Sequence, residues 1–366
     1  MKRTQEMTSV QPDWENFFPR PVSEKAPFFN KDGRIYDCLF AQQFSRDLLT
    51  LLFRTADALR ETTQKKEGAD HVGSLLSDKR AMLYFAQPST RTFMSFLNAC
   101  HVLGMKTSEI RDTSTSSEVK GETPEDTVRT FSSYVDMIIM RHPAPNFVEK
   151  TAWLMNRTGR PVPVVNGGSG KDQHPTQALL DVYTLHRSFN GDIDDKHIVM
   201  VGDLKRGRTV RSLTYLMRNY RKMRLSFVSP KEFRMEADIL EFLKKHDIPF
   251  EETEDFKGVM KTADAIYMTR IQDEHDKAGE SKAVDYSPFY FRQEHLKLIR
   301  KHCVIMHPLP RRHEIEVSVD EDPRAVFWRQ ERNGMWARAA LMAYIFGVDG
   351  KIGSPVPAAA RAGKLQ

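Results

Sequence analysis

The sequence predicts an α/β fold of two doubly wound domains, each with a mostly parallel sheet flanked by helices. The chain has 366 residues, and at about 150 residues per domain this length favours two domains. Short apolar runs alternate with amphipathic stretches, and a plausible helix follows every run but the last. Uninterrupted apolar strands between helices are typical of parallel sheets buried on both faces. The runs are residues 82–86, 135–140, 161–165, 197–204, 225–229, 265–270 and 303–310.

The order of these elements predicts the domain organisation. The proline-containing start has little periodicity, which indicates an extension outside the first domain. A helical stretch ending in Asn-Gly-Asp separates the two series of strands, and a last strong helix at 333–346 is expected to return to the first domain. We therefore expect an extension (1–35), a first domain (36–185, completed by 333–350), a second domain (190–328) and a tail (351–366).

Composition excludes several classes of protein. The 55 Lys and Arg against 49 Asp and Glu give a net charge of +6, yet no basic tract with interleaved aromatic residues suggests nucleic-acid binding. No apolar run approaches the ~18 residues of a membrane span. The three cysteines are far apart and form no CxxC pair, so we expect a reducing, cytoplasmic location without disulfides or a zinc cluster.

The first candidate site is the run Ser89, Thr90, Arg91 and Thr92, which follows a strand and opens a helix. Hydroxyls, free backbone N–H groups and an arginine at one helix N-terminus suit a phosphate. Simple N-capping is the alternative, but it accounts for only one hydroxyl.

Two further candidates follow the next strands. The hydroxyl-rich loop 112–123 carries Lys120; taken alone, it is better interpreted as a solvated loop than as a phosphate-binding one. Arg141 ends a strand, where ligands bind in open α/β sheets, although an ordinary exposed strand end is as good an interpretation.

His174 and Gln177 flank a helix start at Pro175. A lone histidine is more often structural, but one at a helix N-terminus has a lowered pKa and can polarise a carbonyl as a neutral donor. The segment 202–209 nearly matches a P-loop, with Arg208 in place of the lysine, so an arginine fork for a carboxylate is at least as good an interpretation.

The last two strands end in Arg270 with Gln272, and in His-Pro-Leu-Pro around Leu309. The prolines restrict the backbone of Leu309, either to hold its carbonyl toward a ligand or simply to make a rigid turn. No GxSxG, HExxH or EF-hand pattern occurs. Arginines, hydroxyls and one histidine suit a reaction that binds negative charge; we expect no metal and no cofactor.

Seven motifs in order, STRT, KGET, RHP, QHPTQ, GDLKRGRT, MTRIQ and HPLPR, resemble the aspartate carbamoyltransferase catalytic chain, from about Phe40 to Phe346. The resemblance implies a carbamoyl-phosphate domain and an aspartate domain, and a trimer with active sites between subunits. It also implies transfer of the carbamoyl group from carbamoyl phosphate to L-aspartate, the committed step of pyrimidine (UMP) synthesis. A larger assembly with regulatory chains or a dihydroorotase, and no nucleic-acid or membrane partner, would be consistent with it.

The resemblance also implies residue roles. Arg91 would stabilise the leaving phosphate, His174 would polarise the carbamoyl oxygen, and Ser116 and Lys120 would come from the neighbouring subunit. Arg91, Lys120, Arg141 and His174 would be catalytic. Carbamoyl phosphate would be bound by Ser89, Thr90, Arg91, Thr92, Ser116, Lys120, Arg141, His174, Gln177 and the Leu309 backbone, and aspartate by Arg208, Arg270 and Gln272.

Three positions depart from the family pattern. Gln87 and His275 stand where a glutamate and an arginine commonly support domain closure, and Phe93 replaces a usual arginine. We therefore expect weaker or differently supported closure. Two alternatives stay open: a carbamoyltransferase for another amino acid such as ornithine, although those enzymes typically carry HCLP rather than HPLP, or a weakly active homologue with a scaffold role.

Overall fold

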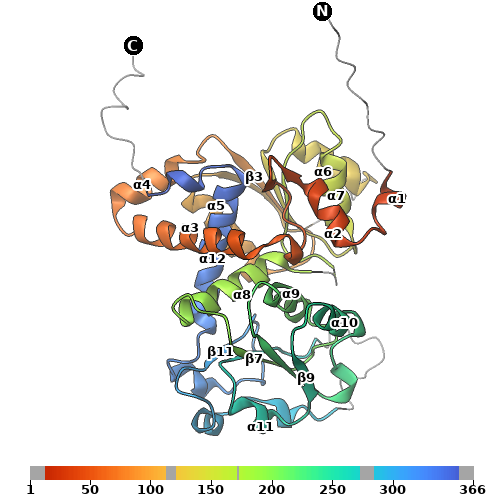
Figure 1. Cartoon of the computed structure of the whole chain (residues 1–366). Coiled ribbons are helices and arrows are strands. Elements are labelled where there is room, and N and C mark those ends of the chain that lie inside the picture. The colour runs from red at the N-terminus through yellow and green to blue at the C-terminus, as the bar shows by residue number, and fades with distance from the viewer. Residues whose placement is uncertain (1–12, 113–120, 171–172, 273–283, 354–366) are drawn as a thin grey trace, which may run out of the picture.

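The computed structural model describes residues 13–112, 121–170, 173–272 and 284–353. Two sheets lie one below the other (Figure 1), and every strand pair within them is parallel. Their strand orders are β4-β3-β5-β6 and β11-β10-β7-β8-β9. The predicted two-domain α/β architecture is confirmed. The strands are β3 (Arg80–Phe85), β4 (Lys106–Ile110), β5 (Met137–Arg141), β6 (Val164–Asn166), β7 (His197–Val201), β8 (Arg224–Val228), β9 (Phe250–Thr253), β10 (Ala265–Met268) and β11 (Val304–Met306).

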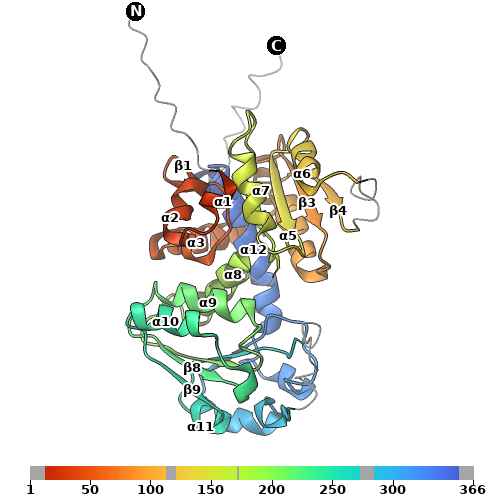
Figure 2. The ribbon, with the colours of Figure 1, turned by 90° about the vertical axis from the view of Figure 1, so that its right-hand side faces the viewer.

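Helices flank both sheets, and some of them link the domains. In Figures 1 and 2, α8 and α12 run through the junction, and α12 packs against α3, α5 and α8 while also contacting β11. In the described ranges, no helix is long and apolar enough to cross a membrane. The main helices are α3 (Arg46–Thr62), α4 (Lys66–Ser74), α5 (Thr90–Val102), α6 (Pro124–Ser132), α7 (Phe147–Met155), α8 (Pro175–Ser188), α9 (Arg208–Met217), α10 (Ala237–Lys245), α11 (Phe256–Met260) and α12 (Phe327–Ile345).

Each apolar run in the sequence overlaps a strand, but two further strands of these two sheets lack such a run. The central strands β5 and β7 are buried at every position, as continuous apolar runs require. The missed strands β4 and β9 lie at sheet edges, and their sequences KTSEI and FEET are mostly exposed or half-buried. A strand paired on one side only needs less apolar surface, so it leaves a weaker sequence pattern.

The N-terminal segment is not an arm outside the first domain, so this expectation is corrected for residues 13–35. Its short elements are α1 (Trp14–Phe17), α2 (Val22–Lys25), β1 (Asn30–Lys31) and β2 (Arg34–Ile35). Phe17 and Phe29 are 2% and 0% exposed within a core cluster that includes β3 and β5 residues. The buried Lys25 ammonium pairs with Glu149 of α7 at 2.6 Å. Four-residue helices are too short for a periodic pattern, and their aromatic side chains supply the packing instead.

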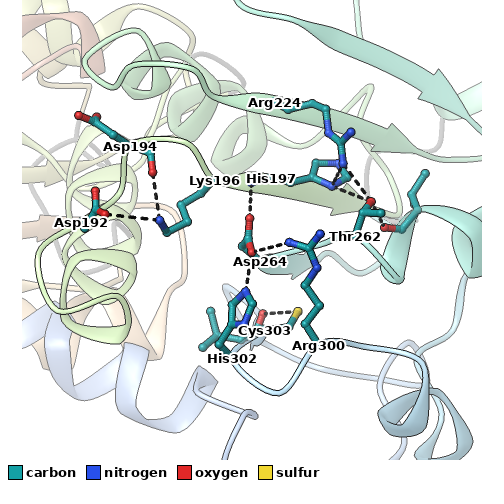
Figure 3. A network of polar contacts seen from close by, with 12 residues as sticks. Asp192, Asp194, Lys196, His197, Arg224, Thr262, Asp264, Arg300, His302 and Cys303 are labelled. Atoms are coloured by element: carbon teal, nitrogen blue, oxygen red, sulfur yellow. Dashed lines mark hydrogen bonds and ion pairs between the residues drawn. The ribbon is translucent and has the colours of Figure 1, made fainter.

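A polar network centred on the buried residues Asp264 and His197 joins the amino-terminal ends of the strands in the second sheet (Figure 3). Asp264, just before β10, accepts the backbone N–H of His197 at 2.8 Å and contacts Arg300 and His302 at 3.1 and 2.7 Å. His197 in turn contacts Arg224 of β8 at 2.7 Å. The network holds the edge of the sheet opposite to the one where the strands present their carboxyl ends.

Candidate active site

A cavity of about 640 Å³ opens between the domains, where the carboxyl ends of strands from both sheets converge. Ligands bind at this edge of open α/β sheets. Every predicted site residue in the described part of the chain lines it, whereas Ser116, Lys120 and the departure at His275 lie outside the described residues. The lining residues are Gln87, Pro88, Ser89, Thr90, Arg91, Thr92, Arg141, His174, Gln177, Arg208, Thr209, Thr269, Arg270, Gln272, His307, Pro308, Leu309, Pro310, Glu331 and Arg338.

The N-terminus of α5 forms one wall of the cavity. Ser89 occupies the N-cap position, but its side chain makes no capping hydrogen bond, so simple capping does not explain this hydroxyl. The first helical turn carries Thr90, Arg91 and Thr92, and its backbone N–H groups and dipole favour an anion. The arrangement fits a phosphate group at this end of the cavity.

Arginines dominate the electrostatics of the cavity. Burial, followed by the charges of Arg208 and Arg91, lowers the pKa of Arg141 to about 9. The Nε atoms of Arg141 and Arg338 are buried and have no hydrogen-bond acceptor among the described residues. Buried donors of this kind are costly unless an acceptor reaches them, so an anion in the cavity would stabilise the arrangement.

His174 caps α8 and is held in one tautomer. Its Nδ1 accepts the backbone N–H of Gln177 at 3.3 Å, so the ring proton is placed on Nε2. Burial, followed by the charge of Arg141, lowers the pKa of His174 well below its ordinary value of 6.5. At neutral pH the ring is therefore a neutral N–H donor.

Gly168 makes room for this ring. Its φ is +95°, and a Cβ there would lie 2.4 Å from Cδ2 of His174 and 2.7 Å from Nε2. Only glycine fits both the backbone conformation and the space.

The second domain also holds the loop that carries His174. Arg208 donates from Nη1 to the carbonyls of Gly168 and Gly170 at 2.7 and 2.6 Å, and the hydroxyl of Ser212 accepts the His174 backbone N–H at 2.9 Å. Arg208, which the sequence predicts to bind a substrate carboxylate, thus also links the two domains in this structure. Ser212 gave no signal in the sequence, because an isolated serine within a helix is ordinary.

Arg270 and Gln272 follow β10 on the same side of the cavity. The Gln272 amide donates to the carbonyl of Arg206 at 3.2 Å, and its backbone N–H donates to the buried Asp203 carboxylate, also at 3.2 Å. Asp203 additionally accepts the backbone N–H of Arg206 at 3.1 Å. The loop after β7 and the end of β10 are thereby fixed to each other.

Sequence reasoning missed two charged residues of α12, Glu331 and Arg338, that also line the cavity. Arg338 is 2% exposed, donates to the Ser95 hydroxyl at 2.6 Å and stacks over the Phe96 ring at 4.8 Å. Burial raises the pKa of Glu331 and lowers that of Arg338 to about 10. Their seven-residue spacing puts both on one helix face with Gly334, and this is the signal that could have identified them.

No cluster of His, Cys, Asp and Glu side chains suited to a metal occurs in the part of the chain that the structure describes. Buried arginines, free helix N–H groups and a neutral imidazole bind and stabilise negative charge. The two-domain fold and this cavity define an enzyme site for group transfer between small anionic substrates.

The chain belongs to the aspartate/ornithine carbamoyltransferase family. The family model "Aspartate/ornithine carbamoyltransferase, carbamoyl-P binding domain" matches residues 37–187, and "Aspartate/ornithine carbamoyltransferase, Asp/Orn binding domain" matches residues 194–345. The resemblance seen in the seven motifs is thereby confirmed.

Similar proteins agree with this membership. The chain is 40% identical over 327 residues to aspartate carbamoyltransferase 1, chloroplastic, of Pisum sativum, covering 87% of this chain and 81% of that protein. It resembles the solved aspartate transcarbamoylase of Trypanosoma cruzi in complex with carbamoyl phosphate and aspartate, at 33% identity and a TM-score of 0.77, over 84% of this chain and 95% of that one. It also resembles the catalytic subunit of M. jannaschii aspartate transcarbamoylase, at 34% identity and a TM-score of 0.76, over 85% of this chain and 98% of that one.

Proposed function

We propose that the protein transfers the carbamoyl group of carbamoyl phosphate to the amine of L-aspartate, as a step of pyrimidine (UMP) biosynthesis. The products are N-carbamoyl-L-aspartate and phosphate. The amine nitrogen bonds to the carbonyl carbon, the bond from that carbon to the phosphate oxygen breaks, and the proton lost by the amine passes to the departing phosphate. The observation that carries the proposal is the convergence, in one cavity, of the α5 N-terminus, neutral His174 and arginines from both domains.

Positioning and charge stabilisation account for the catalysis, because the nucleophile is the substrate's own amine. The first turn of α5 binds the phosphate, and Arg91 stabilises the negative charge that grows as it leaves. The Nε2–H of His174 donates to the carbamoyl oxygen, where charge also develops as the amine attacks. Arg141 lies beside both and contributes a buried positive charge.

Aspartate binds on the side of the second domain. Arg208, Arg270 and Gln272 offer donors to its two carboxylates, and a bidentate arginine pair favours a dicarboxylate over a cationic side chain. Ornithine would meet the same cationic wall without a second carboxylate. Residues 36–185, completed by 333–350, would then bind carbamoyl phosphate, and residues 190–328 would bind aspartate.

We further propose a homotrimer in which Ser116 and Lys120 act in the neighbouring subunit's site. The shark relative, multifunctional protein CAD of Squalus acanthias, matches this chain over only 13% of its own length. In that relative the matching part is joined to other segments in one long chain, and we propose that this chain associates with other enzymes or regulatory chains as separate subunits. Buried, free Cys38, Cys100 and Cys303 suit the proposed reducing cytoplasm, whereas the chloroplastic names of the plant relatives point to a plastid.

A substrate test decides the activity. The purified protein is given carbamoyl phosphate with aspartate, with ornithine, or with neither, and carbamoylated product is measured. We expect N-carbamoyl-L-aspartate only with aspartate. No product with aspartate would refute the proposal, and citrulline formation would favour the ornithine alternative.

Mixing two inactive variants tests the shared site. Lys120→Ala and His174→Ala proteins are each expected to be inactive, but hybrid trimers formed by dissociation and reassociation would contain sites with both residues intact. Recovered activity in the mixture supports the trimer, and light scattering should give three times the mass of one chain. Absence of recovery in demonstrably mixed oligomers would place Lys120 and His174 in sites of one subunit.

A further inference from the structure

A buried hydrogen-bond chain runs beneath the cavity and joins α8, α12 and β10. Its centre is Asp181 of α8, which is 0% exposed. One carboxylate oxygen accepts the side-chain amides of Gln177 at 2.9 Å and Gln330 at 2.7 Å. The other accepts the hydroxyl of Tyr267 at 2.7 Å. Three donors from three elements thus converge on one carboxylate.

The carboxylate fixes which way both amides face. Burial raises the pKa of Asp181 to about 7, but the oxygen that both amides contact, Oδ1, is an acceptor in the ionised carboxylate and also when the proton sits on Oδ2. Gln177 and Gln330 must therefore both turn their NH₂ groups toward Asp181. The Oε1 of Gln330 then accepts the backbone N–H of His307 at 3.0 Å. By the same requirement, Oε1 of Gln177, a residue that lines the cavity, is free to act as an acceptor there.

The other end of the chain reaches Leu309. The Nδ1 of His307 accepts the Leu309 backbone N–H at 2.7 Å, and its Nε2 donates to Glu314 at 2.7 Å. These contacts hold Leu309 at a φ of +52°, which a leucine rarely adopts. The chain therefore ends on two cavity-lining residues, Gln177 and Leu309, one from each side of the domain junction.

We propose that Asp181 and Gln330 are positioning residues which make the site select a carbamoyl group over other acyl groups. They set the Gln177 side-chain oxygen and the Leu309 carbonyl as acceptors for the two N–H bonds of the carbamoyl NH₂. This inference rests on the proposed function. An acyl phosphate with a methyl group in place of NH₂, such as acetyl phosphate, has the same phosphate and carbonyl but leaves both acceptors unpaired.

The expected discrimination is large. A site built to hydrogen-bond an N–H group rejects an analogue that lacks it, because its own polar groups lose their partners. We expect the wild-type kcat/KM for carbamoyl phosphate to exceed that for acetyl phosphate by roughly 10²-fold or more, with aspartate as the acceptor. The second reaction would give N-acetyl-L-aspartate and phosphate through the same bond changes.

Two variants at position 181 separate positioning from mere stability. Asp181→Leu has a similar shape but no acceptor, so the Gln177 amide is released; we expect the selectivity ratio to fall by about tenfold or more. Asp181→Asn keeps one acceptor oxygen for both amides while its NH₂ donates to the Tyr267 oxygen, so it should keep most of the ratio. Circular dichroism and thermal melting establish that each variant is folded.

Gln330→Met interrupts the hydrogen-bond chain at a second, independent point. It removes the acceptor of the His307 N–H without touching Gln177 or Leu309 directly, and it decides the question should Asp181→Leu not fold. We expect its selectivity ratio to fall as well. An unchanged ratio in either folded variant, or an equal fall in Asp181→Asn and Asp181→Leu, would overturn the proposal. Loss of carbamoyl transfer by the wild-type protein would instead refute the proposed function.

Discussion

The close approach of α12 to the cavity makes Gly334→Ala an informative substitution. A Cβ on Gly334 would lie 2.8 Å from Nη1 of Arg338 and 3.0 Å from Cδ2 of Leu180. Arg338 is not free to move away, because it is 2% exposed and its Nη1 is hydrogen-bonded to Ser95. In an open helical site, glycine to alanine stabilises by about 1 kcal/mol. Overpacking costs about 1–3 kcal/mol, so we expect a net loss of roughly 0–2 kcal/mol.

Gly73→Ala is the matched control, since Gly73 also lies within a helix, α4, and a Cβ there meets nothing within 4 Å. It should gain up to about 1 kcal/mol, so the free energies of unfolding of the two variants should differ by roughly 1–3 kcal/mol. Urea unfolding measures this difference. Displacement of Arg338 should also raise the KM for carbamoyl phosphate more than that for aspartate. Equal stabilisation by both substitutions, with an unchanged KM, would refute the reasoning.

The site supports four further predictions. Because burial and nearby arginines lower the pKa of His174 well below 6.5, activity should not fall as the pH drops through 6.5, and a pH–rate profile with a His174 midpoint near 6.5 would contradict this. Below pH 6.5, His174 binds a proton in the unfolded chain but not in the folded one, so the free energy of unfolding should fall as the pH is lowered. Urea unfolding at several pH values measures this fall, which should be smaller in His174→Ala. The Gln87→Glu, His275→Arg double mutant restores the family pair, so we expect saturation at lower aspartate concentration and a higher rate. In the wild-type chain, Gln87 Oε1 is buried without a partner among the described residues. Unchanged saturation curves and rates would count against weakened domain closure. Arg91→Ala should lower kcat by about 10²-fold or more, because it removes charge stabilisation of the leaving phosphate, whereas a change confined to KM would assign Arg91 to binding alone.

The sequence predicted the buried strands better than the edges of the fold. Runs such as 197–204 are apolar because strands such as β7 are covered on both faces, so the burial of these strands can be predicted directly from the sequence. The edge strands β4 and β9, and the packing of Phe17 and Phe29, depend on contacts made only after the chain folds. Such tertiary contacts leave no local period.

Some residues of the candidate site could also be predicted from the sequence, and others could not. Arg141, at the end of a strand, and His174, at the helix start after the next strand, could be proposed because topology brings the carboxyl ends of the strands and the turns that follow them to one edge. Arg338 and Asp181 lie inside helices, where a charge normally indicates a solvated face. Their importance comes from burial against another element, Ser95 for Arg338 and Tyr267 for Asp181, which no spacing along the chain reveals.

The position of α12 also constrains the order in which the protein folds during synthesis. Its contacts join residues far apart in the chain, as in the hydrogen bond from Arg60 to Asn333, 273 positions later. At about 5–20 residues per second, the ribosome needs roughly 15–55 s to make that interval. Until then, the surfaces of α3, α5 and α8 that α12 covers stay exposed, although the first sheet has long been made. The first domain to be synthesised is therefore completed only after the second, and we expect the faces of α3, α5 and α8 that pack against α12 to stay uncovered in the nascent chain until then.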